Sequence, residues 1–334
     1  MFDAHTLPVV FIGLMGLAIF VYAILDGYDL GVGIMLPMDL EDERHRDIMI
    51  ASIGPFWDAN ETWLVLAVGI MLIAFPQAHS VVLFHLYIPA TLMLIGLIMR
   101  GVAFDFRAKA AVDHKYQWDR VFKLGSLFTT LCQGYMLGRY VTGFESTTGA
   151  TLFSCLSAIG VTAAYSYIGG AWLIMKTENR LQKRAIKWTR ISGWLTLLGI
   201  VLVSIVNLMV NPDVFSRWFA MPLAMFVLLI PLVCMTAFWR NDRLLKRLPL
   251  ADDRQCWVPF LYVISIFLMS FLALAFSFFP DIVPGKLDIW QAASAPETLR
   301  VILWGALIVV PVILVYTAFA YKVFHGKATD LHYH

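Results

Sequence analysis

Two pairs of carboxylates stand in strongly apolar stretches of this sequence, at a spacing that could move protons. Asp26 and Asp29 lie in "ILDGYDLGVGIM", and Asp58 and Glu61 lie in "FWDANETWLVL". Side chains three residues apart lie on one face of an α-helix. A charge at mid-membrane costs about 2.5 to 3.5 kcal/mol on insertion scales, so such residues usually face the protein interior, pair, or line a proton or ion path. The spacing therefore predicts two acidic helix faces that could form a proton relay.

A third segment, "LIMRGVAFDFRAK", adds one deep cation, Arg100, and a further acid, Asp105. The acids outnumber this arginine, and desolvation and like-charge repulsion favour the protonated form for some of them. Acids that exist in two protonation states are what a proton relay needs. A structural interpretation stays open, in which Arg100 only neutralises one carboxylate and Asp29 and Asp105 lie in the wet headgroup region. For Asp58 and Glu61 we favour a functional role, because a charged side chain deep in the membrane costs free energy.

The elements that carry these residues are predicted to be membrane helices. The chain is 60% hydrophobic and only 14% charged, with a mean hydropathy of +0.75, which exceeds the apolar content of ordinary soluble domains. Nine apolar runs are long enough to cross a hydrocarbon core of roughly 30 Å. They cover residues 8–36, 50–74, 79–104, 121–141, 151–175, 191–211, 218–239, 258–279 and 300–324. We therefore expect an all-α polytopic membrane protein with nine transmembrane helices.

Lysine and arginine are retained on the cytoplasmic side of membrane proteins, which predicts the orientation. The loops after the first, third, fifth and seventh helices carry most of the basic residues, including Arg46, Arg107 and "KTENRLQKRAIKWTR". The N-terminus is therefore expected outside and the C-terminus in the cytoplasm. We expect residues 1–334 to form a single membrane domain. Two four-helix bundles, in the halves 1–145 and 146–285, and one peripheral helix, 300–324, would account for nine spans.

The sequence indicates no redox centre of its own. Of the eight histidines, His79 and His85 lie near the outer start of the third predicted helix, and no deep pair on facing helices could hold a haem. No Walker loop, GxGxxG motif, nucleophile motif or metal-ligand cluster is present. We therefore expect a chain that binds no cofactor or metal alone.

Three glycines, Gly27, Gly31 and Gly33, follow the first acid. They would either mark an irregular helix end that admits water or allow close helix packing, and packing is the favoured interpretation.

At these same segments the chain resembles subunit II of the cytochrome bd family of quinol oxidases. The matching segments are "DGYDLGVG", "FWDANETWLVL", "MRGVAFDFR", "FPDIVPGKLDIWQAAS" and "VPVILVYTAFAYKVF". The short length and the "RGVAFDFR" wording are closer to the cyanide-insensitive branch. The resemblance spans the whole chain, but residues 130–260 match in hydropathy and helix count only.

The resemblance implies a haem-free subunit of a ubiquinol oxidase in the respiratory electron transport chain of the bacterial cytoplasmic (inner) membrane. Its partner, subunit I, is expected to carry two b haems and a d haem, to oxidise quinol and to reduce oxygen to water with cytoplasmic protons. Small accessory single-helix subunits and membrane lipid are further expected partners.

The resemblance also assigns roles to residues. Asp58, Asp29 and Asp105 become relay candidates, Trp57 a candidate for the subunit or haem interface, and Arg100 the charge partner of the acids. Asp26 and Glu61 complete the expected proton pathway, although family members often have a neutral residue at the position of Glu61. The acids of "ILDGYDLGVG" would then form the cytoplasmic mouth of a path that serves a site in another chain.

Two other classes of function stay open. A proton-coupled secondary transporter would also use intramembrane carboxylates, but it should have discontinuous helices in corresponding positions of both halves. Here the polar features lie in one half, which favours a subunit. A purely structural scaffold for the haem subunit would use its acids only as assembly contacts.

Overall fold

The computed structural model describes residues 3–109, 112–222, 224–250 and 253–328, and these are almost entirely helical. The elements in chain order are α1 (Thr6–Ile34), η1 (Leu40–Asp42), α2 (Glu43–Ile53), α3 (Trp57–Ala74), α4 (Pro76–Lys109), α5 (Val112–Val141), α6 (Thr148–Lys176), α7 (Asn179–Val210), α8 (Pro212–Phe219), α9 (Ala224–Val227), α10 (Leu229–Leu245), α11 (Val258–Phe278), β1 (Asp281–Val283), β2 (Leu287–Asp288), α12 (Ile289–Ala292) and α13 (Pro296–Val323). The all-α prediction is confirmed.

Eight helical segments of the described residues are long and apolar enough to cross a membrane. They are α1, α3, α4, α6, α7, the stretch Ala224–Leu245, α11 and α13. The ninth expected span, 121–141, does form part of a helix, α5, but polar residues run through the whole length of α5 and it is not among the eight. The multi-pass architecture is therefore confirmed, while the count of nine and the orientation stay predictions.

Two expected spans differ in detail from the structure. A continuous helix over 50–74 is wrong, because α2 ends at Ile53 and α3 begins at Trp57. Pro55 lies in this break, and proline has no amide hydrogen and cannot sit inside a regular helix without distorting it. A continuous helix over 218–239 is also wrong, since α9 ends at Val227 and α10 begins at Leu229. Pro231 cannot donate to the carbonyl of Val227, which explains the interruption.

The chain divides into two compact units, which α1 and α4 both enter. The first unit comprises Met1–Asp26, Pro55–His85 and Phe278–Gly326, and the second comprises Gly27–Gly54, Leu86–Ser277 and Lys327–His334. The expected halves 1–145 and 146–285 stay a prediction.

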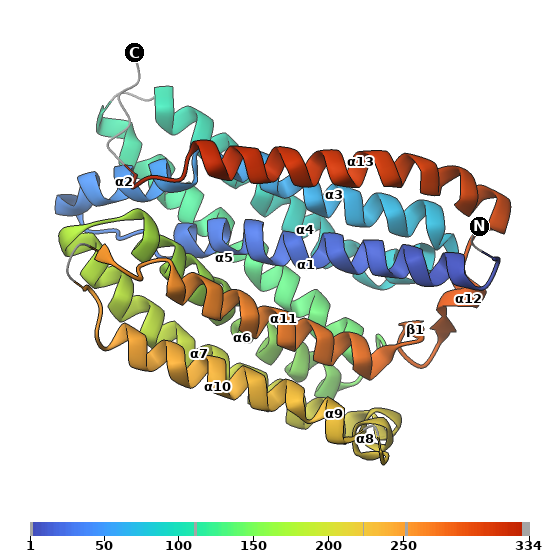
Figure 1. Cartoon of the computed structure of the whole chain (residues 1–334). Helices are drawn as coiled ribbons and strands as arrows, with labels where there is room; N and C mark the ends of the chain where they lie inside the picture. The colour runs from blue at the N-terminus through green and yellow to red at the C-terminus, as the bar shows by residue number, and fades with distance from the viewer. Residues whose placement is uncertain (1–2, 110–111, 223, 251–252, 329–334) are drawn as a thin grey trace. The chain divides into compact units, whose positions relative to one another are not determined.

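In the first unit, α1 and α3 share a small core. Ala18 and Tyr22 of α1 pack with Trp63 and Ala67 of α3, and Ile313 of α13 packs against them. Figure 1 shows α13, in red, running alongside α3. The connection between α11 and α13, residues 279–295, contains a short antiparallel hairpin of β1 and β2 followed by α12. It is tied to the end of α3 where the Ser294 amide donates to the Ala74 carbonyl oxygen at 2.8 Å.

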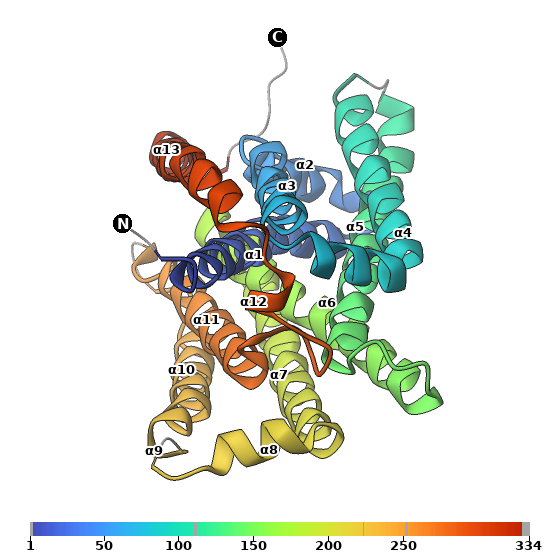
Figure 2. The same cartoon turned by 90° about the vertical axis from the view of Figure 1, so that its right-hand side faces the viewer.

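In the second unit, α6 packs between α5 and α7, and α10 lies against α7 (Figure 2). The end of α1 approaches α6 closely through glycines. A Cβ atom at Gly31 would overlap the carbonyl oxygen of Tyr165, and one at Gly169 would lie 2.6 Å from the carbonyl carbon of Gly31. Because α1 stays helical to Ile34, the glycines do not mark an irregular helix end. Their close contacts confirm the interpretation that they allow close helix packing.

Candidate functional site

The second unit contains an ion pair without any exposed surface. Asp29 of α1 and Arg100 of α4 both have 0% exposure, and Arg100 Nη2 lies 3.9 Å from Asp29 Oδ2. The guanidinium carbon of Arg100 also lies 5.8 Å from the ring centroid of Phe122 on α5, within the range of a cation–π contact. Asp29 is therefore enclosed by protein and does not contact solvent, while its depth in the membrane stays a prediction.

Asp26 lies three residues before Asp29 in the same helix and also has 0% exposure. Neither acid interrupts α1, which is hydrophobic over most of its length. Two carboxylates and one guanidinium are thus buried in helices that qualify as membrane spans, as the sequence predicts for residues that face the protein interior.

The second pair of acids lies at the start of α3 in the first unit. Asp58 is in the first turn and is exposed, whereas Glu61 and Trp57 are half-buried. The break at Pro55 explains this position, because it starts a new helix whose N-terminus carries a positive partial charge that stabilises a carboxylate. Asp58 is therefore a surface residue of this chain, and its expected depth in the membrane stays a prediction.

Asn60, which we did not predict as a site residue, lies between these acids. Its side chain is 2% exposed. Its Nδ2 donates to the Leu25 carbonyl oxygen at 3.5 Å, and its Oδ1 accepts from the Tyr321 hydroxyl at 3.4 Å. Both distances are long, so the amide is held by several weak contacts at the point where α1, α3 and α13 meet. The position of this polar amide between two acids of an apolar segment is the feature of the sequence that could have indicated a buried polar contact.

Asp105 lies on α4 five residues after Arg100 and is exposed. Five residues correspond to about 140° around a helix axis, which explains why Arg100 points into the protein while Asp105 does not. The structure therefore brings Arg100 together with Asp29 and leaves Asp105 on the surface of this chain.

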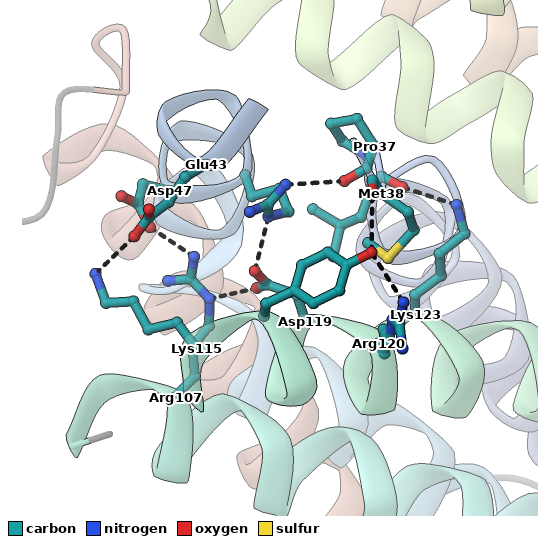
Figure 3. Close-up of polar contacts among 12 residues, drawn as sticks. Pro37, Met38, Glu43, Asp47, Arg107, Lys115, Asp119, Arg120 and Lys123 are labelled. Atoms are coloured by element: carbon teal, nitrogen blue, oxygen red, sulfur yellow. Dashed lines mark hydrogen bonds and ion pairs between the residues drawn. The ribbon is translucent and has the colours of Figure 1, made fainter. Parts of the chain in front are cut away.

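A buried ion-pair network that we did not predict joins α2 to α4 and α5 (Figure 3). Asp119 has 0% exposure, and its two oxygens accept from Arg46 Nε at 2.8 Å and Arg107 Nε at 2.5 Å. Arg107 Nη2 also donates to Asp47 Oδ1 at 2.5 Å. From the sequence we expected Arg46 and Arg107 only to be loop charges that indicate the orientation in the membrane. Their common partner is 73 and 12 residues away in sequence, so no local pattern could reveal it.

The segment after α1 is held by side chains of α5, also visible in Figure 3. Lys123 Nζ donates to the Leu36 carbonyl oxygen at 2.7 Å, and the Tyr116 hydroxyl donates to the Met38 carbonyl oxygen at 2.9 Å. These bonds fix the chain a few residues beyond the acids of α1.

Asp42, in η1, links this same segment to α7. A hydrogen bond from Arg184 Nη1 at 2.5 Å holds the pKa of the Asp42 carboxyl below its ordinary value of 3.8; partial burial opposes this effect and a contact with His45 at 2.8 Å adds to it.

In the part of the chain that the structure describes, no group of three or more His, Cys, Asp or Glu side chains could hold a metal ion. His79 and His85 both lie on α4, so they cannot face each other from two helices across a haem.

The chain is similar to known proteins in both sequence and fold. The family model of cytochrome bd terminal oxidase subunit II matches residues 7–324. The chain is 26% identical over 368 residues to cytochrome bd-I ubiquinol oxidase subunit 2 of Escherichia coli (strain K12), covering 98% of this chain and 97% of that protein. It is 33% identical over 223 residues to cytochrome bd ubiquinol oxidase subunit 2 of Bacillus subtilis (strain 168), covering 62% and 64% of the two chains.

A solved structure, of the bd oxidase from Geobacillus thermodenitrificans, has the same fold. It superposes with a TM-score of 0.79 over 96% of this chain and 98% of that chain, at 18% sequence identity.

Proposed function

Since this chain belongs to the cytochrome bd terminal oxidase subunit II family, we propose that it is the haem-free subunit of a quinol:oxygen oxidoreductase and helps to conduct cytoplasmic protons to the oxygen-reducing site. It is a multi-pass protein of the bacterial inner membrane and a member of an oxidoreductase complex. Its partner is subunit I, in which two b haems and a d haem are expected. The cyanide-insensitive branch, quinol oxidation by the complex and small accessory subunits belong to the same proposal.

One observation carries the proton role: Asp29 and Arg100 form an ion pair with 0% exposure inside two apolar membrane helices. Removing two charges from water costs several kcal/mol per ion, so a buried pair is weak evidence for stability. Ionisable residues inside membrane helices are expensive and usually functional. We assign to Arg100 the role of keeping a negative charge on Asp29, while Asp26, one turn away on α1, offers a second buried carboxyl group.

The exposed acids support the proposal that this chain delivers protons to another subunit. Asp58 and Asp105 lie on the surface of this chain in helices that qualify as membrane spans. A carboxylate at such a position needs water or a protein partner rather than lipid. We propose that Asp58 and Glu61 of the first unit exchange protons where subunit I covers this chain, and that Trp57, beside Asp58, packs at this subunit interface. For Asp105 of the second unit we propose the same role, independently of the other two acids.

The experiment replaces Asp58 by Asn in the intact complex. Proton transfer by a positioned side chain contributes roughly 10²- to 10⁴-fold to a rate, so oxygen consumption per haem should fall at least about tenfold while the complex assembles with normal haem content. Asp58→Glu, which keeps the titratable group, should recover most of the rate. Asp213→Asn, at an exposed position of α8, makes the same chemical change elsewhere and should leave the rate unchanged.

Normal oxygen consumption in a fully assembled Asp58→Asn complex would contradict the relay. It would leave the scaffold interpretation, in which the acids serve only as assembly contacts.

A further inference from the structure

One face of α7 is exposed along most of its length and changes character from one end to the other. Lys183 and Lys187, which are exposed, come first on this face, followed by the half-buried Arg190. An apolar stretch continues the same helical spacing, with Ile191, Trp194, Leu195 and Leu198 each between 51% and 55% exposed. The face is therefore basic at its start and apolar beyond it.

A groove follows the apolar part of this face. It has a volume of about 410 Å³ and is lined mainly by α6 and α7, from Trp188 to Leu202 on the α7 side. The two helices approach closely at Gly160 and Gly199, where a Cβ atom on Gly199 would lie 3.2 Å from the Gly160 Cα atom. Because neither glycine has a side chain, the groove between the helices is not filled at this contact. The fourteen residue steps from Trp188 to Leu202 span about 21 Å, comparable to one leaflet of a bilayer that is about 40 to 45 Å thick with its headgroups.

The groove itself offers little to a polar ligand. The hydroxyl groups of Thr162 and Ser166, which line it, donate to backbone carbonyl oxygens one turn back on α6, each at 2.8 Å. The hydroxyl of Ser192 likewise donates to the Trp188 carbonyl oxygen at 2.9 Å. The groove is thus suited to a hydrocarbon chain.

A second, smaller hollow lies directly at the basic end of the groove. It has a volume of about 360 Å³, it is lined by Lys183, Lys187, Arg190 and Trp194, and it shares Ile191 with the apolar groove. Arg190 Nε lies 3.3 Å from Asp242 Oδ1, so part of its charge is already neutralised. Among the residues that the structure describes, no carboxylate forms an ion pair with Lys183 or Lys187. Two ammonium groups are therefore available for a negatively charged ligand.

We propose that this face of α7 is a binding site for one anionic phospholipid. The phosphate of the headgroup binds between Lys183 and Lys187, and one acyl chain lies in the groove between α6 and α7. Trp194 and Trp188 lie at the junction, where the amphipathic indole is favoured at a membrane–water interface. Basic pockets between helices on the cytoplasmic side are a recurrent way to bind anionic headgroups. The inference needs only that the chain spans a membrane, so it does not depend on the proton role.

The test uses the intact purified complex and native mass spectrometry. Dioleoyl phosphatidylglycerol is titrated against wild type, Lys183→Gln/Lys187→Gln and a matched control, Lys109→Gln/Lys322→Gln, which removes two exposed charges elsewhere. Each lysine near an anionic lipid contributes roughly fivefold, so the first double variant should bind about 25-fold more weakly and the control like wild type. Dioleoyl phosphatidylcholine and dihexanoyl phosphatidylglycerol should bind weakly to wild type, because the first lacks net charge and the second lacks a long chain.

Three results would overturn the site. Equal phosphatidylglycerol binding by wild type and Lys183→Gln/Lys187→Gln would show that the lysines do not hold the headgroup. Equal binding of the short-chain lipid would show that the groove is not used. Loss of the partner subunit in Lys183→Gln/Lys187→Gln, with the control intact, would show that a protein surface covers this face.

Discussion

At the scale of single residues, the account depends on Arg100 and its partner Asp29. Both are fully buried, so each stabilises the charge of the other in a place where water is excluded. The sequence showed that Arg100 is the deep cation of its segment, but it could not show which acid the arginine meets. That choice follows from the packing of α4 against the end of α1, which brings Asp29 rather than Asp105 into reach.

Arg100→Leu should therefore impair assembly. Removing one member of a buried ion pair costs about 3 to 5 kcal/mol, because the remaining charge is left uncompensated. The yield of haem-containing complex and its thermal midpoint in detergent should both fall, and Asp29→Asn/Arg100→Leu should recover part of the loss. Arg240→Leu, at an exposed position of α10, is the control and should assemble normally. A stable, haem-replete Arg100→Leu complex would show that the pair has no structural role.

Asp42 gives a prediction for pH. Its hydrogen bond from Arg184 lowers the pKa of the folded-state carboxyl below 3.8, so the ionised form stabilises the folded protein above that pH. This contribution should disappear as the pH falls through the lowered pKa. Wild type should therefore have a higher thermal midpoint than Asp42→Asn at pH 6, and the difference should shrink steadily below pH 3.8. A difference that stays constant from pH 6 to pH 3 would rule out the ionised pair as its cause.

At the scale of elements, hydropathy predicts most of the long helices and the glycines predict close packing of α1. The interruptions at Pro55 and Pro231 were readable from the prolines, but the apolar runs continued through both and concealed them. The network around Asp119 was not readable, since its arginines lie on two other helices. For the candidate site, the sequence placed the acids of α1 in an apolar helix but left open whether Asp29 contacts water, and the structure encloses both acids. The exposure of Asp58 follows from the break at Pro55.

The contact between α1 and α6 can be tested with two glycines of α1. Gly31→Ala would place a methyl group on the backbone of Tyr165, so the helices must separate, at a cost of about 1 to 3 kcal/mol or more. The thermal midpoint of the complex should fall. Gly13→Ala is the matched control, because a Cβ atom there has nothing within 4 Å. Equal midpoints for the two variants would show that α1 and α6 are not packed this closely.

At the scale of the whole molecule, the chain provides membrane helices, buried charges and surface acids, and its described residues contain no group of three or more His, Cys, Asp or Glu side chains that could hold a metal ion. Membership of the subunit II family, rather than any absent site, is the ground for our proposal that this chain supports chemistry carried out in another subunit. A transporter would complete its task within one chain or with copies of itself. The central claim is therefore that oxygen-reducing haems and this chain are in the same complex but in different polypeptides.

The most direct measurement is native mass spectrometry of the complex purified through this chain in mild detergent, with a reduced-minus-oxidised optical spectrum of the same sample. We predict haem bands in the spectrum and a second, larger chain in the intact mass. On activation, this chain should be released at its bare polypeptide mass, and the haems should stay with the partner. Release of this chain with haem attached, or its isolation without a haem-bearing partner, would contradict the account.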